Sequence, residues 1–137
     1  MAITTPSTEI LLALDPIPDA VRAARHALRA RGLPEELDHT VSLLASELVG
    51  NAVRHARLRP EDQIVFFARL ADDHVHVEVA DRGPGFDPEV RHEASGFGLR
   101  LVDKLATRWG VERTAAGCRV WFDVDRRRGR FARDDPA

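Results

Sequence analysis

The spacing of hydrophobic residues changes along the chain, and each change predicts a new element of secondary structure. A short apolar run over residues 10–14 predicts a strand, and the prolines that follow end it. Apolar residues then recur every three or four positions over 20–31 and over 34–56, which predicts two helices. The second helix is expected to face the core with the apolar stripe Leu37, Val41, Leu44, Leu48 and Ala52.

Farther along, the period of the pattern becomes two, which is typical of strands with one buried face. Residues 63–70 and 74–80 predict two such strands, and a third helix is expected after Gly96. Residues 109–115 and 118–125 then predict a hairpin. Because strands are interleaved with three predicted helices, we expect an α+β fold, a two-layer α/β sandwich in which a mixed, mostly antiparallel sheet is covered on one face by the helices.

Composition places the chain among small globular proteins. Its 137 residues are 44% hydrophobic and 31% charged, which fits one domain at 9–125 between a flexible start at 1–8 and a flexible charged tail at 126–137. A net charge of -2 argues against direct nucleic-acid binding. The single cysteine, Cys118, excludes an internal disulfide and a cysteine-rich zinc site. No apolar run is long enough to span a membrane and no secretion signal begins the chain, so we expect a cytoplasmic protein without a membrane partner.

Three polar side chains line up on the second predicted helix and form the first candidate site. Glu47, Asn51 and Arg54 are spaced four and three residues apart, so they lie along one line of the helix beside its buried stripe. A carboxylate can act as a base, an amide oxygen suits Mg²⁺, and an arginine suits phosphate. Gly50 lies among them at a cost to helix stability. The alternative is a solvated polar edge, with Gly50 at a close helix crossing.

Two glycine-containing segments form the second and third candidate sites. Asp81 follows the valine-rich strand and precedes Gly83 and Gly85, so backbone and ligand could approach its carboxylate closely. Such a carboxylate could accept a hydrogen bond from the exocyclic amine of a base. Gly96 and Gly98 precede the third predicted helix, whose free amides offer a phosphate site. Taken singly, the two segments are equally compatible with a plain turn and a flexible helix entry.

In order and spacing, the three segments together resemble the Bergerat-fold ATP-binding superfamily, which includes histidine kinases, DNA gyrase and MutL. The resemblance covers about residues 10–125. Within the superfamily the chain is most similar to the small bacterial anti-sigma-factor serine/threonine kinases. The matching motifs are an N box at Glu47 and Asn51, a first glycine box at Asp81-x-Gly83-x-Gly85 and a second at Gly96-x-Gly98.

The resemblance implies a role for each matched residue. Asn51 would bind the Mg²⁺ that bridges the ATP phosphates, Glu47 would be the base for the attacking hydroxyl, and Asp81 would accept from the adenine amino group. Arg54 is an additional candidate for a phosphate contact. The residues expected to bind the nucleotide are Asn51, Arg54, Asp81, Gly83, Gly85, Gly96, Phe97, Gly98 and Leu99.

The resemblance also implies a function and partners. The chain would bind ATP and Mg²⁺, hold a sigma factor inactive, and phosphorylate a serine or threonine of an anti-anti-sigma partner of the STAS type; members of the family also form homodimers. Ala94 departs from the pattern, because these kinases carry an arginine just before the Ser-Gly-x-Gly stretch. This departure favours a nucleotide-gated binding module without kinase turnover. A stand-alone catalytic domain of the histidine-kinase type is the other alternative, and the short lid at 86–95 argues against it.

The remaining basic residues are not expected to form a site. His74 and His76 share one strand face, but two histidines without a third ligand make a poor metal site. His55, near the end of the second helix, is expected to be packed there and favoured by the helix C-terminus. The arginines of 126–133 are expected to be solvated.

Overall fold

The structure, a computed structural model, describes residues 7–55, 58–82, 99–115 and 117–126. Its elements agree in type and order with those that the sequence predicts, and residues 99–105 form the described part of the third predicted helix. No helix within these ranges has the length and hydropathy of a membrane span. The other elements are β1 (Thr8–Leu14), α1 (Asp19–Ala30), α2 (Glu35–His55), β2 (Ile64–Leu70), β3 (His74–Asp81), β4 (Arg108–Thr114) and β5 (Gly117–Asp125).

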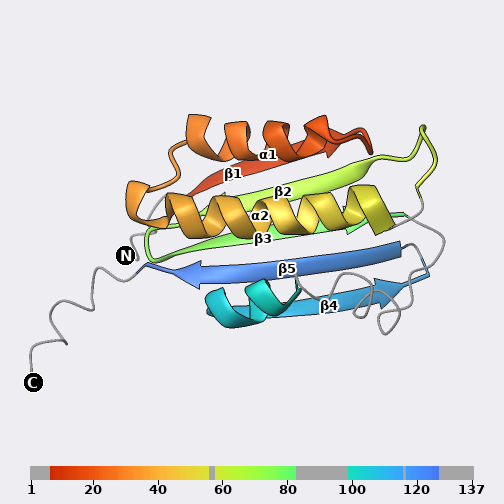
Figure 1. Ribbon diagram of the computed structural model, residues 1–137. Coiled ribbons are helices and arrows are strands. Elements are labelled where there is room, and N and C mark those ends of the chain that lie inside the picture. Colours follow the sequence, from red (N-terminus) through yellow and green to blue (C-terminus); the bar gives the residue numbers. More distant parts are fainter. Residues whose placement is uncertain (1–6, 56–57, 83–98, 116, 127–137) are drawn as a thin grey trace, which may run out of the picture.

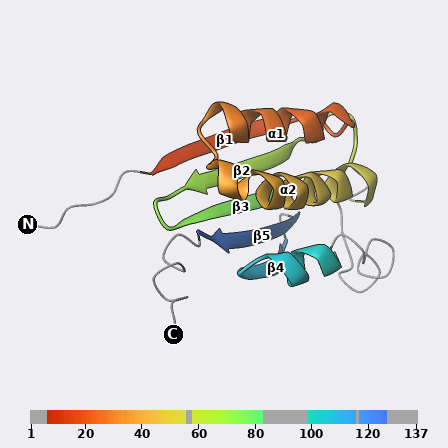
Figure 2. The ribbon, with the colours of Figure 1, turned by 60° about the vertical axis from the view of Figure 1, so that its left-hand side comes forward.

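The five strands form one sheet with the order β1-β2-β3-β5-β4. Helices α1 and α2 and the helical residues 99–105 lie on the same side of this sheet (Figures 1 and 2). The expected two-layer α+β fold is therefore confirmed. All neighbouring strands in the described part of the chain are antiparallel, so the parallel pairing that a mixed sheet would contain is not found there.

Alternation along the strands builds a core between the two layers. In β2, β3 and β5 every second side chain is buried, as the period of two predicts. The predicted apolar stripe of α2 is buried in full and packs over the same strands. The buried face of these strands consists of Ile64, Phe66, Ala68, Leu70, Val75, Val77, Val79, Cys118, Val120, Phe122 and Val124.

A glycine ends the α1 region and turns the chain toward α2. Gly32 has a φ of 101°, in the left-handed region that favours glycine. Its amide donates to the carbonyl of Arg29 at 3.2 Å, and the Leu33 amide donates to that of Leu28 at 3.0 Å. The turn lets α1 pack against α2, and it brings Arg29 Nε within 3.1 Å of Asp38 Oδ1 in α2.

The lowered pKa of Asp38 predicts that the stability of the protein depends on pH. The Ser42 hydroxyl donates to Asp38 Oδ1 at 2.8 Å, and this bond, together with Arg29, lowers the pKa of the carboxyl. The pKa of Asp38 is lower in the folded state than in the unfolded state, so the ionised carboxylate stabilises the fold. This stabilisation is present above the unfolded-state pKa and is lost as pH falls through the folded-state pKa. We therefore expect Ser42→Ala to destabilise the protein at pH 7 and to reduce its loss of stability between about pH 5 and 3, measured by urea unfolding.

Ser46→Ala is the matched control, because the Ser46 hydroxyl donates to the Ser42 carbonyl at 2.7 Å and not to a carboxylate. This variant should keep the pH dependence of the wild-type chain. Equal pH profiles for Ser42→Ala and the wild type would contradict the role of Asp38.

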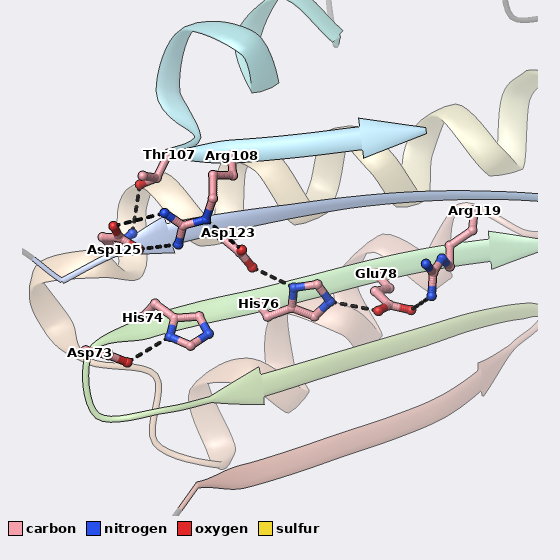
Figure 3. A network of polar contacts seen from close by, with 9 residues as sticks. All are labelled: Asp73, His74, His76, Glu78, Thr107, Arg108, Arg119, Asp123 and Asp125. Atoms are coloured by element: carbon pink, nitrogen blue, oxygen red, sulfur yellow. Dashed lines mark hydrogen bonds and ion pairs between the residues drawn. The ribbon is translucent and has the colours of Figure 1, made fainter. Parts of the chain in front are cut away.

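The face of the sheet opposite the helices carries a network of paired charges (Figure 3). His76 lies between two carboxylates, with Nδ1 2.6 Å from Asp123 Oδ1 and Nε2 2.7 Å from Glu78 Oε2. Arg119 extends the network to Glu78 and Arg108 extends it to Asp123, each across 3.1 Å. His74 and His76 thus share the face opposite the valines, as predicted. The described residues contain no group of three or more histidine, cysteine, aspartate or glutamate side chains that could hold a metal ion.

Beside these charges, the uncovered face is apolar near its β1 edge. Leu11 is 71% exposed and Val65 is 41% exposed. Phe67 is half-buried, with its ring centroid 6.3 Å from that of His76 and 5.5 Å from the Arg69 guanidinium carbon. The consecutive residues Phe66 and Phe67 therefore lie on opposite faces of the sheet in very different surroundings.

Arg126, which is predicted to belong to the flexible charged tail, is hydrogen-bonded to the domain. Its Nη2 donates to Glu36 Oε2 at 2.8 Å, and its amide donates to the Asp73 carbonyl at 2.9 Å. The first arginine of the basic run thus ties the end of β5 to α2 and to the turn between β2 and β3.

Candidate functional site

Helix α2 carries all three polar side chains of the first candidate site, and the structure places them at different depths. Asn51 is 3% exposed, Glu47 is half-buried and Arg54 is exposed. Glu47 and Asn51 are one helical turn apart, so the carboxylate and the amide lie on the same side of α2. The row therefore runs from the half-buried Glu47 through the buried Asn51 to the exposed Arg54.

Arg54 folds back along α2 toward Asn51. Its Nη2 donates a hydrogen bond to Asn51 Oδ1 at 3.2 Å. A Cβ at Gly50 would lie 2.9 Å from Arg54 Nη1, and the nearest atoms to that position all belong to the Arg54 guanidinium. The group nearest to Gly50 is thus an arginine side chain of the same helix and not a second helix. The glycine leaves space for an arginine side chain of the same helix, and no pattern in the sequence predicts this arrangement.

Asp81 ends β3 on the side of the sheet that the helices cover. It follows Val75, Val77 and Val79 in the alternation and is 6% exposed. Its neighbour in the register is Cys118 of β5, which is buried as well. A carboxylate thus lies at the exit of the strand, in the position that the sequence predicts, and it is enclosed by the protein.

Buried polar groups are rare in this fold, which makes these positions informative. In the described ranges, the buried polar or charged residues are Ser42, Asn51 and Asp81. Burying such a group is costly unless it has a partner or a function. Ser42 serves the structure of α2 through Asp38. Asn51 accepts a hydrogen bond from Arg54. Asn51 and Asp81 lie on two elements that pack together, α2 and β3, on the same side of the sheet.

The glycine boxes fall mostly outside the described residues. The predicted site residues Gly83, Gly85, Gly96, Phe97 and Gly98 lie there, as do Ala94 and the predicted lid at 86–95. Leu99, the last residue of the predicted set, is described; it is helical and 8% exposed. The structure therefore describes Glu47, Asn51, Arg54, Asp81 and Leu99 of the candidate site.

A cavity of about 390 Å³ opens near Asp81 at the end of the sheet. One cross-strand row of its lining lies on the face without helices, because Val65, Ala80, Arg119 and Glu112 are successive partners in the register. The lining also includes the buried residues Asp81 and Cys118. The cavity includes neither Glu47 nor Asn51. The cavity thus reaches Asp81, the predicted acceptor for the adenine amino group, but it does not extend to the two polar residues of α2.

The described residues fit a magnesium nucleotide by their donor chemistry. Mg²⁺ prefers oxygen ligands, keeps several waters and is commonly held by one or two protein oxygens together with substrate phosphates. The single amide oxygen of Asn51 suits such a shared site, whereas no cage of acidic ligands is present in the described part of the chain. The buried Asp81 carboxylate suits the exocyclic amino group of a purine, because it accepts hydrogen bonds and cannot donate them when ionised.

Comparison with known proteins shows the family of the chain. The family described as Histidine kinase-like ATPase domain matches residues 12–124. No curated protein sequence is significantly similar to the chain.

The solved structures that share the fold include the following two. The first contains the RsbU and RsbW domains of Rv1364c from Mycobacterium tuberculosis; it is 25% identical, has a TM-score of 0.67 and is matched over 88% of this chain and 34% of its own. The second is the histidine kinase domain of a blue-light activated histidine kinase from Erythrobacter litoralis, which is 23% identical with a TM-score of 0.58 over 86% of this chain and 63% of its own. The chain thus spans about one third of the first structure and less than two thirds of the second.

Proposed function

Because the chain belongs to the histidine kinase-like ATPase domain family, we propose that it binds ATP with Mg²⁺ and acts as an anti-sigma regulatory factor in transcription control. It holds a sigma factor inactive and transfers the γ-phosphoryl group of ATP to a serine or threonine of an anti-anti-sigma partner of the STAS type. The observation that carries the proposal is the burial of Asn51 in α2 and of Asp81 in β3, two elements that pack together on the helix-covered side of the sheet. The likeness to a structure that contains an RsbW domain supports the choice within the family.

In this proposal each polar residue acts on a different part of the reaction. Asp81 accepts a hydrogen bond from the adenine amino group, and Asn51 Oδ1 is the protein ligand of Mg²⁺, which when bound neutralises phosphate charge. Glu47 orients the attacking hydroxyl and accepts its proton as the bond from that oxygen to the γ-phosphorus forms. The bond from the γ-phosphorus to the bridging oxygen breaks, and ADP leaves. Such a reaction needs mainly positioning and charge neutralisation.

Glu47→Gln tests the base. We expect phosphoryl transfer to fall by about 10²- to 10⁴-fold, because an amide cannot accept the hydroxyl proton. Nucleotide affinity should stay within a few-fold of wild type, since the substitution keeps the shape of the side chain. Transfer of labelled γ-phosphate to the partner and fluorescence of a mant-nucleotide measure the two quantities.

Glu61→Gln is the matched control for Glu47→Gln, because Glu61 is exposed in the segment before β2. It should change neither quantity. Full phosphoryl transfer by Glu47→Gln would show that Glu47 is not the base. Loss of nucleotide binding in the same variant would place Glu47 in the binding site instead.

The partners are tested by a pull-down from lysate with and without ATP, read by mass spectrometry. We expect the captured proteins to include a sigma factor. We also expect a STAS-type protein that becomes phosphorylated on a serine or threonine when ATP is present. Light scattering on the purified chain tests the expected homodimer. Every part of the proposed function requires saturable binding of a magnesium nucleotide. A purified chain that shows no such binding would contradict the proposed function.

Two alternatives give different results in the same assays. A nucleotide-gated binding module, which Ala94 favours, would bind MgATP and its partner without phosphoryl transfer. In that case Asn51→Ala would abolish regulation in cells and Glu47→Ala would leave it unchanged. A catalytic domain of the histidine-kinase type would produce an acid-labile phosphohistidine, whereas phosphoserine and phosphothreonine are stable in acid.

A further inference from the structure

We propose that Arg54 is a positioning residue that couples metal binding to nucleotide binding; the inference rests on the nucleotide site proposed above. As long as no nucleotide is bound, the Arg54 guanidinium donates a hydrogen bond to the amide oxygen of Asn51. When a nucleotide arrives, the guanidinium pairs with its phosphates and releases that oxygen for Mg²⁺. The site then binds the metal together with the nucleotide and excludes the metal alone.

The contact between the two side chains carries the first step. Arg54 Nη2 donates to Asn51 Oδ1 at 3.2 Å, and this oxygen is the atom that would bind the metal. Asn51 is 3% exposed, so few other groups can reach its amide. Arg54 is exposed, and no carboxylate of the described residues forms an ion pair with it. Among the described residues, one side-chain hydrogen bond, the one to Asn51, therefore holds the exposed guanidinium.

Gly50 gives the arginine its place on the helix. A Cβ at this position would lie 2.9 Å from Arg54 Nη1 and 3.5 Å from two further atoms of the guanidinium, with no other neighbour as close. A Cβ at this position would therefore meet the Arg54 guanidinium before any other group and displace it. A glycine is unfavourable in the middle of a helix, and the folded-back arginine is the structural reason for it here.

Electrostatics explain why the arginine and the metal exclude each other. Magnesium binds oxygen at about 2.0–2.1 Å, so an ion on Asn51 Oδ1 would lie within a few ångströms of the guanidinium nitrogen, and like charges at this distance repel. Phosphate oxygens offer the guanidinium a charged, bidentate partner that is stronger than a neutral amide. A nucleotide therefore draws Arg54 off Asn51, whereas the metal alone does not.

The test measures metal binding without nucleotide, using Mn²⁺ alone as the probe and electron paramagnetic resonance as the readout. We expect Arg54→Ala to bind Mn²⁺ about 10-fold more tightly than the wild-type chain and MgATP about 10-fold more weakly, because it loses both the competing cation and the phosphate contact. Gly50→Ala should also bind Mn²⁺ more tightly, but it keeps the arginine and should retain MgATP affinity within a few-fold. Arg22→Ala, which removes an exposed arginine from α1, should leave both affinities unchanged.

The outcomes separate this inference from the proposed function. If the wild-type chain binds MgATP and the Mn²⁺ affinity of Arg54→Ala equals that of the wild type, the coupling is wrong and the proposed function stands. If Arg22→Ala raises Mn²⁺ affinity as much as Arg54→Ala, the effect is one of net charge and the coupling is again wrong. Absence of MgATP binding by the wild-type chain overturns the proposed function, and the inference with it. Circular dichroism of each variant confirms that it is folded.

Discussion

Replacing Asp81 by asparagine is expected to lower the affinity for ATP by about 10- to 100-fold, because a hydrogen bond to a charged acceptor is lost in a buried place. Asp81 is 6% exposed, so water cannot easily substitute for the missing interaction. The same change should narrow the preference for ATP over GTP. Guanine carries the acceptor O6 where adenine carries an amino donor, and a carboxylate repels that oxygen, whereas an asparagine amide can donate to it. Competition of ATP and GTP against a mant-nucleotide measures both effects.

Asp73→Asn is the matched control for Asp81→Asn, since it makes the same charge change just before the opposite end of β3. The Asp73 side chain is 81% exposed, and the variant should bind both nucleotides like the wild-type chain. If Asp81→Asn keeps the wild-type preference for ATP, Asp81 does not recognise the base.

Phe66→Ala is expected to destabilise the protein by about 3–5 kcal/mol, because it removes a large side chain from a close-packed core. Phe66 is fully buried in β2 between the sheet and the helices. Since domains of this size have a free energy of unfolding of about 5–15 kcal/mol, the substitution should remove a large part of the protein's stability. Urea unfolding followed by circular dichroism measures the loss.

The next residue provides the matched comparison for Phe66→Ala. Phe67 carries the same side chain on the uncovered face, where it contacts the His76 ring and the Arg69 guanidinium. Phe67→Ala should therefore cost only about 1 kcal/mol. An equal loss in the two variants would mean that the uncovered face is packed against something in solution.

The fold could be predicted from the sequence because burial and hydrophobic period coincide in nearly every element. The four buried positions of β5 alternate without interruption, and the stripe of α2 follows the helical repeat. The position of β5 inside the sheet also has a local signal. The side chains of β4 are exposed or half-buried, as suits an edge strand, whereas β5 alternates cleanly and pairs with strands on both sides.

The contacts between side chains could not be predicted in the same way. His76 meets Asp123 only because β3 pairs with β5, and this register joins residues 47 positions apart. Spacing alone aligned Asn51 and Arg54 on one side of α2, but the hydrogen bond between them depends on a rotamer that Gly50 permits. Most residues of the two glycine boxes lie outside the described ranges, so their roles in nucleotide binding stay predictions.

The sheet order also has a consequence for folding kinetics and for evolution. The pairs β2–β3 and β4–β5 join neighbours along the chain, whereas β3–β5 closes a long connection that contains residues 82–107. Local hairpins should form first and the β3–β5 pairing late, because closing a long loop costs entropy before the contacts form. That cost grows slowly, by about 0.6 kcal/mol for each doubling of loop length. Insertions or deletions between β3 and the third helix should therefore be tolerated, so that proteins sharing this sheet can differ in the segment without losing stability.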